Sequence, residues 1–435
     1  MTEDPNLRAS LTEATPRLRR RRAAEARFRF YGIAAISVGL LFLAALLVSV
    51  VAKGYPAFQQ TMIKLDVDLK RDVIDPQNLG TAKAVMTGDV FRWDPLIEDA
   101  IVTTLGVAPD DAAAADDARK LLSSGSRIRL RDTVARDPSL IGATQGIWLV
   151  ADDVVDSFVK GSISAETPES RRQINDRQIA MVRNLQKAGL LEKRFNTGLF
   201  THGASSRPEM AGVGAAIAGS FYMMAVVLIL ALPIGVAASI YLEEFAPRNR
   251  WTDLIEVNIN NLAAVPSIVY GILGLAAFIN FAGLPRSAAL VGGLVLTLIT
   301  LPTIIITTRA SLKAVPPSIR EAALGVGASK MQAVFHHVAP LAMPGVLTGA
   351  IIGLARALGE TAPLLMIGMV AFVVDIPRTP MEPSTALPVQ IYMWANSAER
   401  AFVERTSAAI MILLGFLAVM NVIAIILRRR FEHRW

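Results

Sequence analysis

The sequence contains no cysteine. Disulfide bridges and thiolate metal sites are therefore excluded, and any exported part of the chain has to be held together by its own packing. Only four histidines occur in 435 residues, which leaves little material for a nucleophile with its base or for a metal cluster. We accordingly predict no catalytic residue, no metal site and no enzymatic activity.

A glycine-rich loop that ends in Gly-Lys-Ser or Gly-Lys-Thr is also missing. Such a loop holds the phosphate groups of ATP with its backbone N–H groups. Without it the chain cannot bind ATP as a P-loop protein does, and we predict no cofactor. If ATP hydrolysis drives this protein, the ATPase is a separate chain.

Aromatic residues are scarce as well, at 6%, although 53% of the residues are hydrophobic. Such an apolar content lies outside the range of soluble domains and predicts a membrane protein. A helix needs about 20 apolar residues to cross a bilayer core of about 30 Å. Six segments are long enough, the fifth despite its Arg356 and Glu360. We predict membrane spans at 30–52, 212–242, 257–282, 287–308, 344–374 and 406–427.

The net charge of +7 indicates membrane orientation rather than nucleic-acid binding, because the basic residues gather beside the predicted spans. With six spans, four basic groups fall on one side of the membrane. These groups are Arg17, Arg19 to Arg22, Arg27 and Arg29; Arg248 and Arg250; Arg309, Lys313, Arg320 and Lys330; and Arg428 to Arg430 with Arg434. By the positive-inside rule that side is the cytoplasm, so both termini are predicted to be cytoplasmic. We expect contacts with membrane lipid and none with nucleic acid.

The first apolar segment, Phe30 to Ala52, follows a basic stretch and has a secretory signal as its alternative interpretation. Its 23 residues exceed the apolar core of a signal by about one to two helical turns, which favours a span that is not cleaved. The predicted organisation is a basic, disordered tail at 1–29, the first span at 30–52, a separate domain at 53–208, a membrane unit at 209–430 and a short tail at 431–435.

Residues 53–208 lack any segment that could span lipid, and they have the size of an independent domain. Hydrophobic periodicity predicts strands at 62–69, 127–130 and 146–150, and helices at 110–122 and 170–188. We therefore predict a small α+β domain on the periplasmic side. Asp152 and Asp153 are expected on one strand with their side chains on opposite faces, as solvated surface charges.

A predicted cytoplasmic loop at 309–343 carries the most informative pattern. Glu321, Ala322 and Ala323 are followed by Gly327 and then by Pro340. A glycine between two short amphipathic pieces allows a compact helix-turn-helix that a soluble partner can grip. Ordinary helix-and-cap chemistry is the alternative explanation for such a pattern.

This pattern resembles the EAA loop of bacterial ABC importer permeases. In that family the loop forms coupling helices that dock on an ATPase subunit. The resemblance implies that Glu321 supplies a charged contact and that Gly327 makes the turn. His337 and Ala339 stand where the family usually has Ile and Leu, which leaves the detail of the second short helix open.

Three further motifs lie in the membrane unit. They are Tyr-Leu-Glu-Glu-Phe-Ala-Pro at 241–247, Val-Pro-Ser-Ile-Val-Tyr-Gly at 265–271 and Ala-Arg-Ala-Leu-Gly-Glu-Thr-Ala-Pro at 355–363. Together with the loop they resemble the PstA-type permease subunits of phosphate ABC importers. Residues 53–208 resemble, more weakly, the extra N-terminal domain of some PstA-type proteins.

The resemblance implies an all-α membrane protein with six transmembrane helices of the ABC importer permease type, and with a small α+β periplasmic domain between helices 1 and 2. It implies a multi-pass protein of the bacterial cytoplasmic (inner) membrane that imports inorganic phosphate. The implied partners are a PstC-type permease subunit, PstB-type ATPase subunits and a PstS-type periplasmic phosphate-binding protein.

Arg356 and Glu360 are the strongest candidates for the substrate pathway. A charge near the middle of a membrane costs about 2.5 to 3.5 kcal/mol, so it should face a partner or a polar cavity. At a spacing of four residues the two side chains are expected to share one helix face and to pair. The arginine fork suits the oxygens of phosphate. A buried structural ion pair between helices is the alternative.

Ser267 and Thr361 are candidate neutral donors along the same pathway, with helix–helix hydrogen bonding as their alternative role. Two other functions stay open. One is a permease for another oxyanion such as molybdate, sulfate or phosphonate. The other is a membrane receptor with a periplasmic sensing domain, although its cytoplasmic segments are too short to form an output module.

Overall fold

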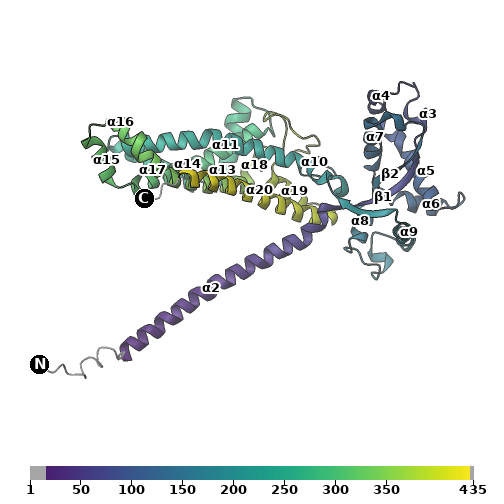
Figure 1. Cartoon of the computed structure of the whole chain (residues 1–435), viewed down its shortest axis with the longest axis horizontal. Helices are drawn as coiled ribbons and strands as arrows, with labels where there is room; N and C mark the ends of the chain where they lie inside the picture. Colours follow the sequence, from purple (N-terminus) through teal and green to yellow (C-terminus); the bar gives the residue numbers. More distant parts are fainter. Residues whose placement is uncertain (1–15, 432–435) are drawn as a thin grey trace. The chain divides into compact units, whose positions relative to one another are not determined.

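The computed structural model describes residues 16–431 (Figure 1). The chain forms two units, residues 1–53 and 54–435. In the first unit the described part is one helix, α2 (Pro16–Gly54), which contains the predicted span 30–52. Residues 16–29 belong to this helix, so the disorder predicted for the tail 1–29 is wrong over that part. Residues 1–15 and most of the predicted tail 431–435, with Arg434, lie outside the described residues.

The second unit begins with an α+β domain (residues 55–210). Its antiparallel sheet has the strand order β2-β1-β3, with β1 at Gln59–Asp68, β2 at Thr144–Val150 and β3 at Leu191–Phe195. The strands predicted at 62–69 and 146–150 are confirmed, while β3 was not predicted. Along β1, buried Leu65 and Val67 alternate with exposed Lys64, Asp66 and Asp68, so one face of the sheet is buried.

Five helices of this domain supply much of the rest of its core. They are α5 (Asp94–Thr104), α6 (Ala112–Arg119), α7 (Ser126–Arg136), α8 (Asp153–Val159) and α9 (Asp176–Lys187). Helices α6 and α9 lie within the segments predicted as helical. The strand predicted at 127–130 is wrong, because these residues form part of α7. Leu130 and Val134 are buried one helical turn apart, whereas Ile128 is exposed, which is the helical rather than the strand period.

Asp152 and Asp153 also differ from expectation. Asp152 caps α8, with its Oδ1 accepting a hydrogen bond from the backbone N–H of Val154 at 3.1 Å, and Asp153 is the first residue of that helix. Burial, followed by the adjacent charge of Asp153, raises the pKa of Asp152 to about 7. The two carboxyl groups therefore interact instead of pointing to opposite faces of a strand.

The remainder of the second unit is helical and apolar. Its main helices are α11 (Gly214–Ile240), α12 (Arg250–Ala264), α13 (Ser267–Gly274), α14 (Ala289–Ala314), α17 (Ala339–Gly359), α18 (Ala362–Met366), α19 (Leu387–Ala395) and α20 (Ala401–Phe431). Helix α14 packs against α11, α12, α13 and α17, and it is the most buried of the long helices (Figure 1). The described residues contain five helices long and apolar enough to span a membrane, or six if α12 and α13 form one bent span. This architecture confirms the predicted fold class.

Two predicted spans are broken. The segment 257–282 bends by 100° between α12 and α13, because Pro266 lacks an N–H group and holds Val265 in an extended conformation. The segment 344–374 is helical only to Gly359. Glu360 is extended, the short helix α18 follows, and the chain is then irregular up to α19. Both predicted spans therefore contain a break in their helix.

The raised pKa of Asp152 predicts a pH-dependent stability of the α+β domain. The unfolded carboxyl ionises near its ordinary pKa of 3.8 and the folded one only near 7, so stability falls as the pH rises between these values. Asp152→Asn keeps the helix cap. Without the titrating carboxyl, the variant should not show the decrease in unfolding free energy, on the order of 2 kcal/mol, that we expect between about pH 5 and 7. Hydrogen exchange of the α8 amides in the full-length protein measures it. Exposed Asp110→Asn is the matched control, and an unchanged pH slope in Asp152→Asn would contradict the assignment.

Candidate functional site

A hairpin of residues 317–338 contains the Glu-Ala-Ala pattern. Its first helix, α15 (Pro317–Gly325), ends just before Gly327, which has a φ of +92°. A side chain other than glycine is strained in this left-handed region, so the residue predicted to make the turn does have the required conformation. Ser329 then starts the next helix by forming a capping box with Gln332.

The second half of the hairpin is not an isolated short helix. α16 (Lys330–Gln332) continues through the π-helical turn η8 (Ala333–Val338) into α17, and the whole segment Lys330–Gly359 is one candidate span. Pro340 is the second residue of α17 and therefore lies inside this continuous segment, directly after the π-helical turn. The hairpin and a membrane helix are thus one continuous element.

The tip of the hairpin is exposed. Glu321 and Ala322 are accessible, whereas Ala323 is buried against the rest of the hairpin. The neighbouring exposed apolar residues are Leu324, Val326, Met331 and Phe335. Apolar side chains gathered on an exposed turn are typical of a protein-binding surface.

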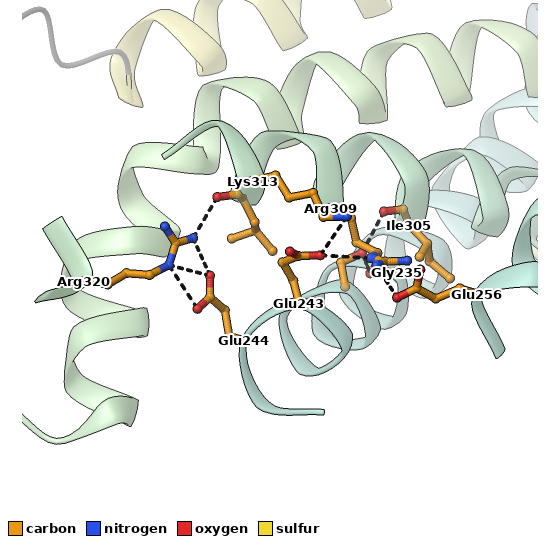
Figure 2. Close-up of polar contacts among 10 residues, drawn as sticks. Gly235, Glu243, Glu244, Glu256, Ile305, Arg309, Lys313 and Arg320 are labelled. Atoms are coloured by element: carbon orange, nitrogen blue, oxygen red, sulfur yellow. Dashed lines mark hydrogen bonds and ion pairs between the residues drawn. The ribbon is translucent and has the colours of Figure 1, made fainter. Parts of the chain in front are cut away.

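An ion pair joins the hairpin to the end of α11 (Figure 2). Arg320 donates through Nη2 to Oε1 of Glu244 at 2.6 Å and through Nε to the same oxygen at 3.1 Å. Its guanidinium also donates to the carbonyl oxygens of Leu312 at 2.9 Å and Val315 at 2.8 Å. The Glu244 side chain is only 8% exposed. Arg320 directly precedes Glu321, and its ion pair therefore connects α15 to the π-helical turn η6 (Tyr241–Phe245).

A second group of charges continues this connection along α14. Arg309 pairs with Glu256 of α12 at 2.5 Å and with Glu243 of η6 at 3.3 Å, and Lys313 lies 3.6 Å from Glu243 (Figure 2). We did not predict these contacts from the sequence. The available signal was the Glu-Glu pair of the 241–247 motif together with the basic residues of the loop 309–343. The network holds the C-terminal ends of α11 and α14 together with the middle of α12 and with α15.

Arg356 and Glu360 lie at the other end of α17. Nε of Arg356 is 3.5 Å from Oε1 of Glu360, so the two side chains do approach each other. They do not share a helix face, because Glu360 is extended and lies just beyond the last residue of the helix. The Arg356 side chain is 49% exposed. The Glu360 side chain is 19% exposed, so within this chain the pair is partly buried, and it does not connect two helices.

The two helix breaks meet in space. A Cβ atom on Gly271 of α13 would lie 2.7 Å from the Cα atom of Pro363 in α18, so glycine is needed for this close approach. The 265–271 motif therefore packs against the 355–363 motif. Ser267 is the first residue of α13 and Thr361 directly precedes α18, and both are partly buried. Interrupted helices are where membrane transporters often place polar groups for a substrate.

Within residues 16–431, no cluster of three or more His, Asp or Glu side chains has an arrangement that could hold a metal ion. The chemistry of the two sites is accordingly that of arginine, carboxylate and hydroxyl groups. The hairpin site can bind a protein, and the break site can offer hydrogen bonds to a small polar solute.

Comparisons with known protein families identify both parts of the chain. Residues 231–435 match the family described as binding-protein-dependent transport system inner membrane component. Residues 15–169 match a domain of unknown function (DUF3333).

Individual relatives agree with this. The probable ABC transporter permease protein YqgI of Bacillus subtilis (strain 168) is 36% identical over 155 residues, which are 35% of this chain and 52% of that protein. The phosphate transport system permease protein PstA 1 of Mycobacterium tuberculosis (strain CDC 1551 / Oshkosh) is 31% identical over 236 residues, 53% of this chain and 76% of that protein. PstA of Yersinia pestis is 31% identical over 244 residues, 55% of this chain and 80% of that protein.

The chain thus spans about half the length of the first of these relatives and at least three quarters of the other two. The resemblance inferred from the motifs is confirmed. The chain belongs to the family of binding-protein-dependent transport inner-membrane components, as a homologue of the PstA permeases that carries an additional N-terminal DUF3333 domain.

Proposed function

We propose that this chain is the PstA-type subunit of an ATP-driven importer of inorganic phosphate. The hairpin 317–338 carries the proposal, because it combines an exposed apolar tip with a charged anchor on the membrane helices. The names of the PstA relatives support phosphate as the solute. Membership of a permease family argues against the membrane-receptor alternative.

In this proposal the hairpin docks on a separate ATPase subunit and transmits its movement. Leu324, Val326 and Met331 would enter the ATPase surface. A displacement at Met331 reaches Arg356 along one continuous helical segment, about 37 Å long at 1.5 Å per residue. The Arg320–Glu244 pair would transmit the same displacement to α11. Rigid-body rocking of packed helices is a common result of such a coupling.

The partners of the proposed importer are a PstC-type permease subunit, PstB-type ATPase subunits and a PstS-type phosphate-binding protein. The chain would lie in a bacterial inner membrane with the hairpin and both termini in the cytoplasm. The basic residues of the loop 309–343 support this orientation. The α+β domain would then be periplasmic.

Arg356 would contact phosphate transiently, with Glu360 orienting its guanidinium and limiting the strength of binding. A solute held too tightly would not be released, so a half-exposed arginine beside a carboxylate suits a passage better than a storage site. Ser267 and Thr361 would add neutral donors at the paired helix breaks. Molybdate, sulfate and phosphonate are the competing solutes.

Gly327 tests the docking of the ATPase. Gly327→Val places a β-branched side chain at a φ of +92°, which costs roughly 1 to 2 kcal/mol and distorts the turn. We expect the ATPase subunit to be lost on co-purification in mild detergent. Gly325→Ala is the control, because Gly325 is helical and a Cβ there meets nothing within 4 Å. Normal ATPase retention in Gly327→Val would argue against docking at the hairpin.

Arg320 tests the transmission of force. Arg320→Ala leaves the Glu244 carboxylate largely buried without this partner, at a cost of about 1 to 3 kcal/mol. We expect ATP hydrolysis to continue while uptake falls roughly tenfold. The exchange Arg320→Glu with Glu244→Arg should recover part of the uptake. Equal losses of hydrolysis and uptake in Arg320→Ala would contradict a coupling role.

Arg356 tests the solute pathway. Phosphate uptake into vesicles containing the complete importer is measured with sulfate and phosphonate as competitors. Arg356→Lys keeps the charge but loses the planar fork, and a hydrogen bond to a charged group contributes roughly 1.5 to 3 kcal/mol, so uptake should fall about 10- to 100-fold. Ile352→Val, at an exposed position of the same helix, is the control. Full uptake by Arg356→Lys excludes a bidentate contact, and preferred uptake of a competitor assigns another oxyanion.

A further inference from the structure

Buried charges connect the α+β domain to the N-terminal end of α20. The Lys160 side chain, just after α8, is 2% exposed. Its Nζ lies 2.6 Å from Oδ2 of Asp156 and 2.7 Å from Oε1 of Glu404. Asp156 is further fixed by the backbone N–H of Thr61 in β1, at 2.9 Å from its Oδ1. One ammonium group thus bridges a carboxylate of the domain and a carboxylate in the first turn of α20.

The next residue of α20 continues the junction. Arg405 is 3% exposed, and its Nη2 lies 3.5 Å from the carbonyl oxygen of Glu209, which also accepts a 2.7 Å hydrogen bond from Nε2 of Gln60. The Glu209 carboxylate accepts a hydrogen bond from Oγ of Ser123 at 2.5 Å, and burial raises its pKa. Both charged residues at this end of α20 therefore face the α+β domain.

Apolar packing closes around these charges. Ala57 lies two residues before β1 and is fully buried in a cluster with Phe402, Ala408 and Trp394. A Cβ atom on Gly54 would lie 2.8 Å from the backbone nitrogen of Ala408, so the chain enters the domain in direct contact with α20. The domain is consequently packed on this helix and does not hang from two flexible linkers.

Burying so many charges is an inefficient way to gain stability, because each ion has to leave water. Buried ionic groups can instead specify one arrangement among several that apolar contacts alone would allow. A lysine between two carboxylates, with an arginine on the adjacent residue, has few alternative positions. The geometry of this junction therefore favours one register of α20 against the domain.

The other end of α20 reaches the hairpin-bearing helix. Nη1 of Arg428 lies 3.4 Å from Oγ1 of Thr348 in α17, and α20 packs along α17. From Glu404 to Arg428 the helix is about 36 Å long at 1.5 Å per residue, which is close to the thickness of a bilayer core. One continuous helix thus connects the buried charges with the helix that carries Arg356.

We infer that the α+β domain positions α20 for transport, and that Lys160, Glu404 and Arg405 are the positioning residues. The junction stays closed throughout the transport cycle, and the domain is a fixed support rather than a moving lid. This inference rests on the proposed function for its transport readout. The contact between Lys160 and Glu404 can be tested without it.

The first experiment measures phosphate uptake by the complete importer in vesicles. Lys160→Met leaves two buried carboxylates without their bridge and should lower the maximal uptake rate about 3- to 30-fold, with the half-saturating phosphate concentration unchanged. The exchange Lys160→Glu with Glu404→Lys again places one lysine between two carboxylates. The ammonium group is then at position 404, and the carboxylates are those of Asp156 and of position 160. This exchange should recover uptake to within about threefold of the original rate. Lys193→Met, on the exposed side of β3, is the control.

The second experiment uses the absence of cysteine in the chain. Lys160→Cys with Glu404→Cys forms a unique thiol pair, to be joined by a short bifunctional maleimide in the assembled complex. We expect efficient cross-linking and, after it, an uptake rate higher than before. This arm remains informative if Lys160→Met does not fold.

Three results would overturn the inference. They are normal uptake by both Lys160→Met and the uncross-linked cysteine pair, failure of the pair to cross-link, and loss of uptake on cross-linking, which would mean that the junction has to open. If the pair cross-links while the unmodified complex imports a different solute or none, the proposed function fails and the junction stands.

Discussion

The membrane part of this chain depends on one constraint: backbone N–H and C=O groups in lipid have to be bonded within the protein. Continuous helices without proline satisfy it, as α20 does. A helix can be interrupted at membrane depth only where other protein segments cover the break. The helices that follow the breaks at Pro266 and Glu360, α13 and α18, pack on each other where Gly271 meets Pro363.

The same pairing explains why polar residues gather there. Arg356, Glu360, Ser267 and Thr361 all lie at helix ends or next to them. Elsewhere in these helices a charged side chain would face lipid or a packed core at considerable cost. Charged residues also gather beside the hairpin. Arg309 and Arg320 pair there with three glutamates (Figure 2).

Short sequence patterns predicted those strands and turns whose conformation depends on neighbouring residues. The alternation of 62–69 predicted β1, and the glycine of the Glu-Ala-Ala pattern predicted a turn that does require a positive φ. The strand expected at 127–130 was wrong because four alternating residues fit a helix equally well once Leu130 and Val134 define the buried face. The bend at Pro266 has a visible cause in the sequence, whereas the charge-free length of the segment does not indicate where it bends.

Contacts between distant residues were not accessible in the same way. Lys160 and Glu404 are 244 positions apart, and no periodicity relates a lysine after a short helix to a glutamate before an apolar run. Arg320 directly precedes the Glu-Ala-Ala pattern and Glu244 lies in the 241–247 motif, yet neither motif identifies the other as its partner. Which charges pair is decided by the packing of whole helices, and that packing is the part a single sequence specifies least directly.

The π-helical turn η8 has a consequence for the direction in which the hairpin faces. A π turn holds one residue more than an α-helical turn, so it rotates everything before it by about 100° relative to everything after it. Met331 and Phe335 therefore owe their direction, relative to α17, to a single extra residue between Ala333 and Val338. His337, one of the two departures from the family pattern, lies inside this turn, and Ala339 starts the helix beyond it. The six residues of η8 thus determine the direction in which the hairpin tip faces relative to the helix of Arg356.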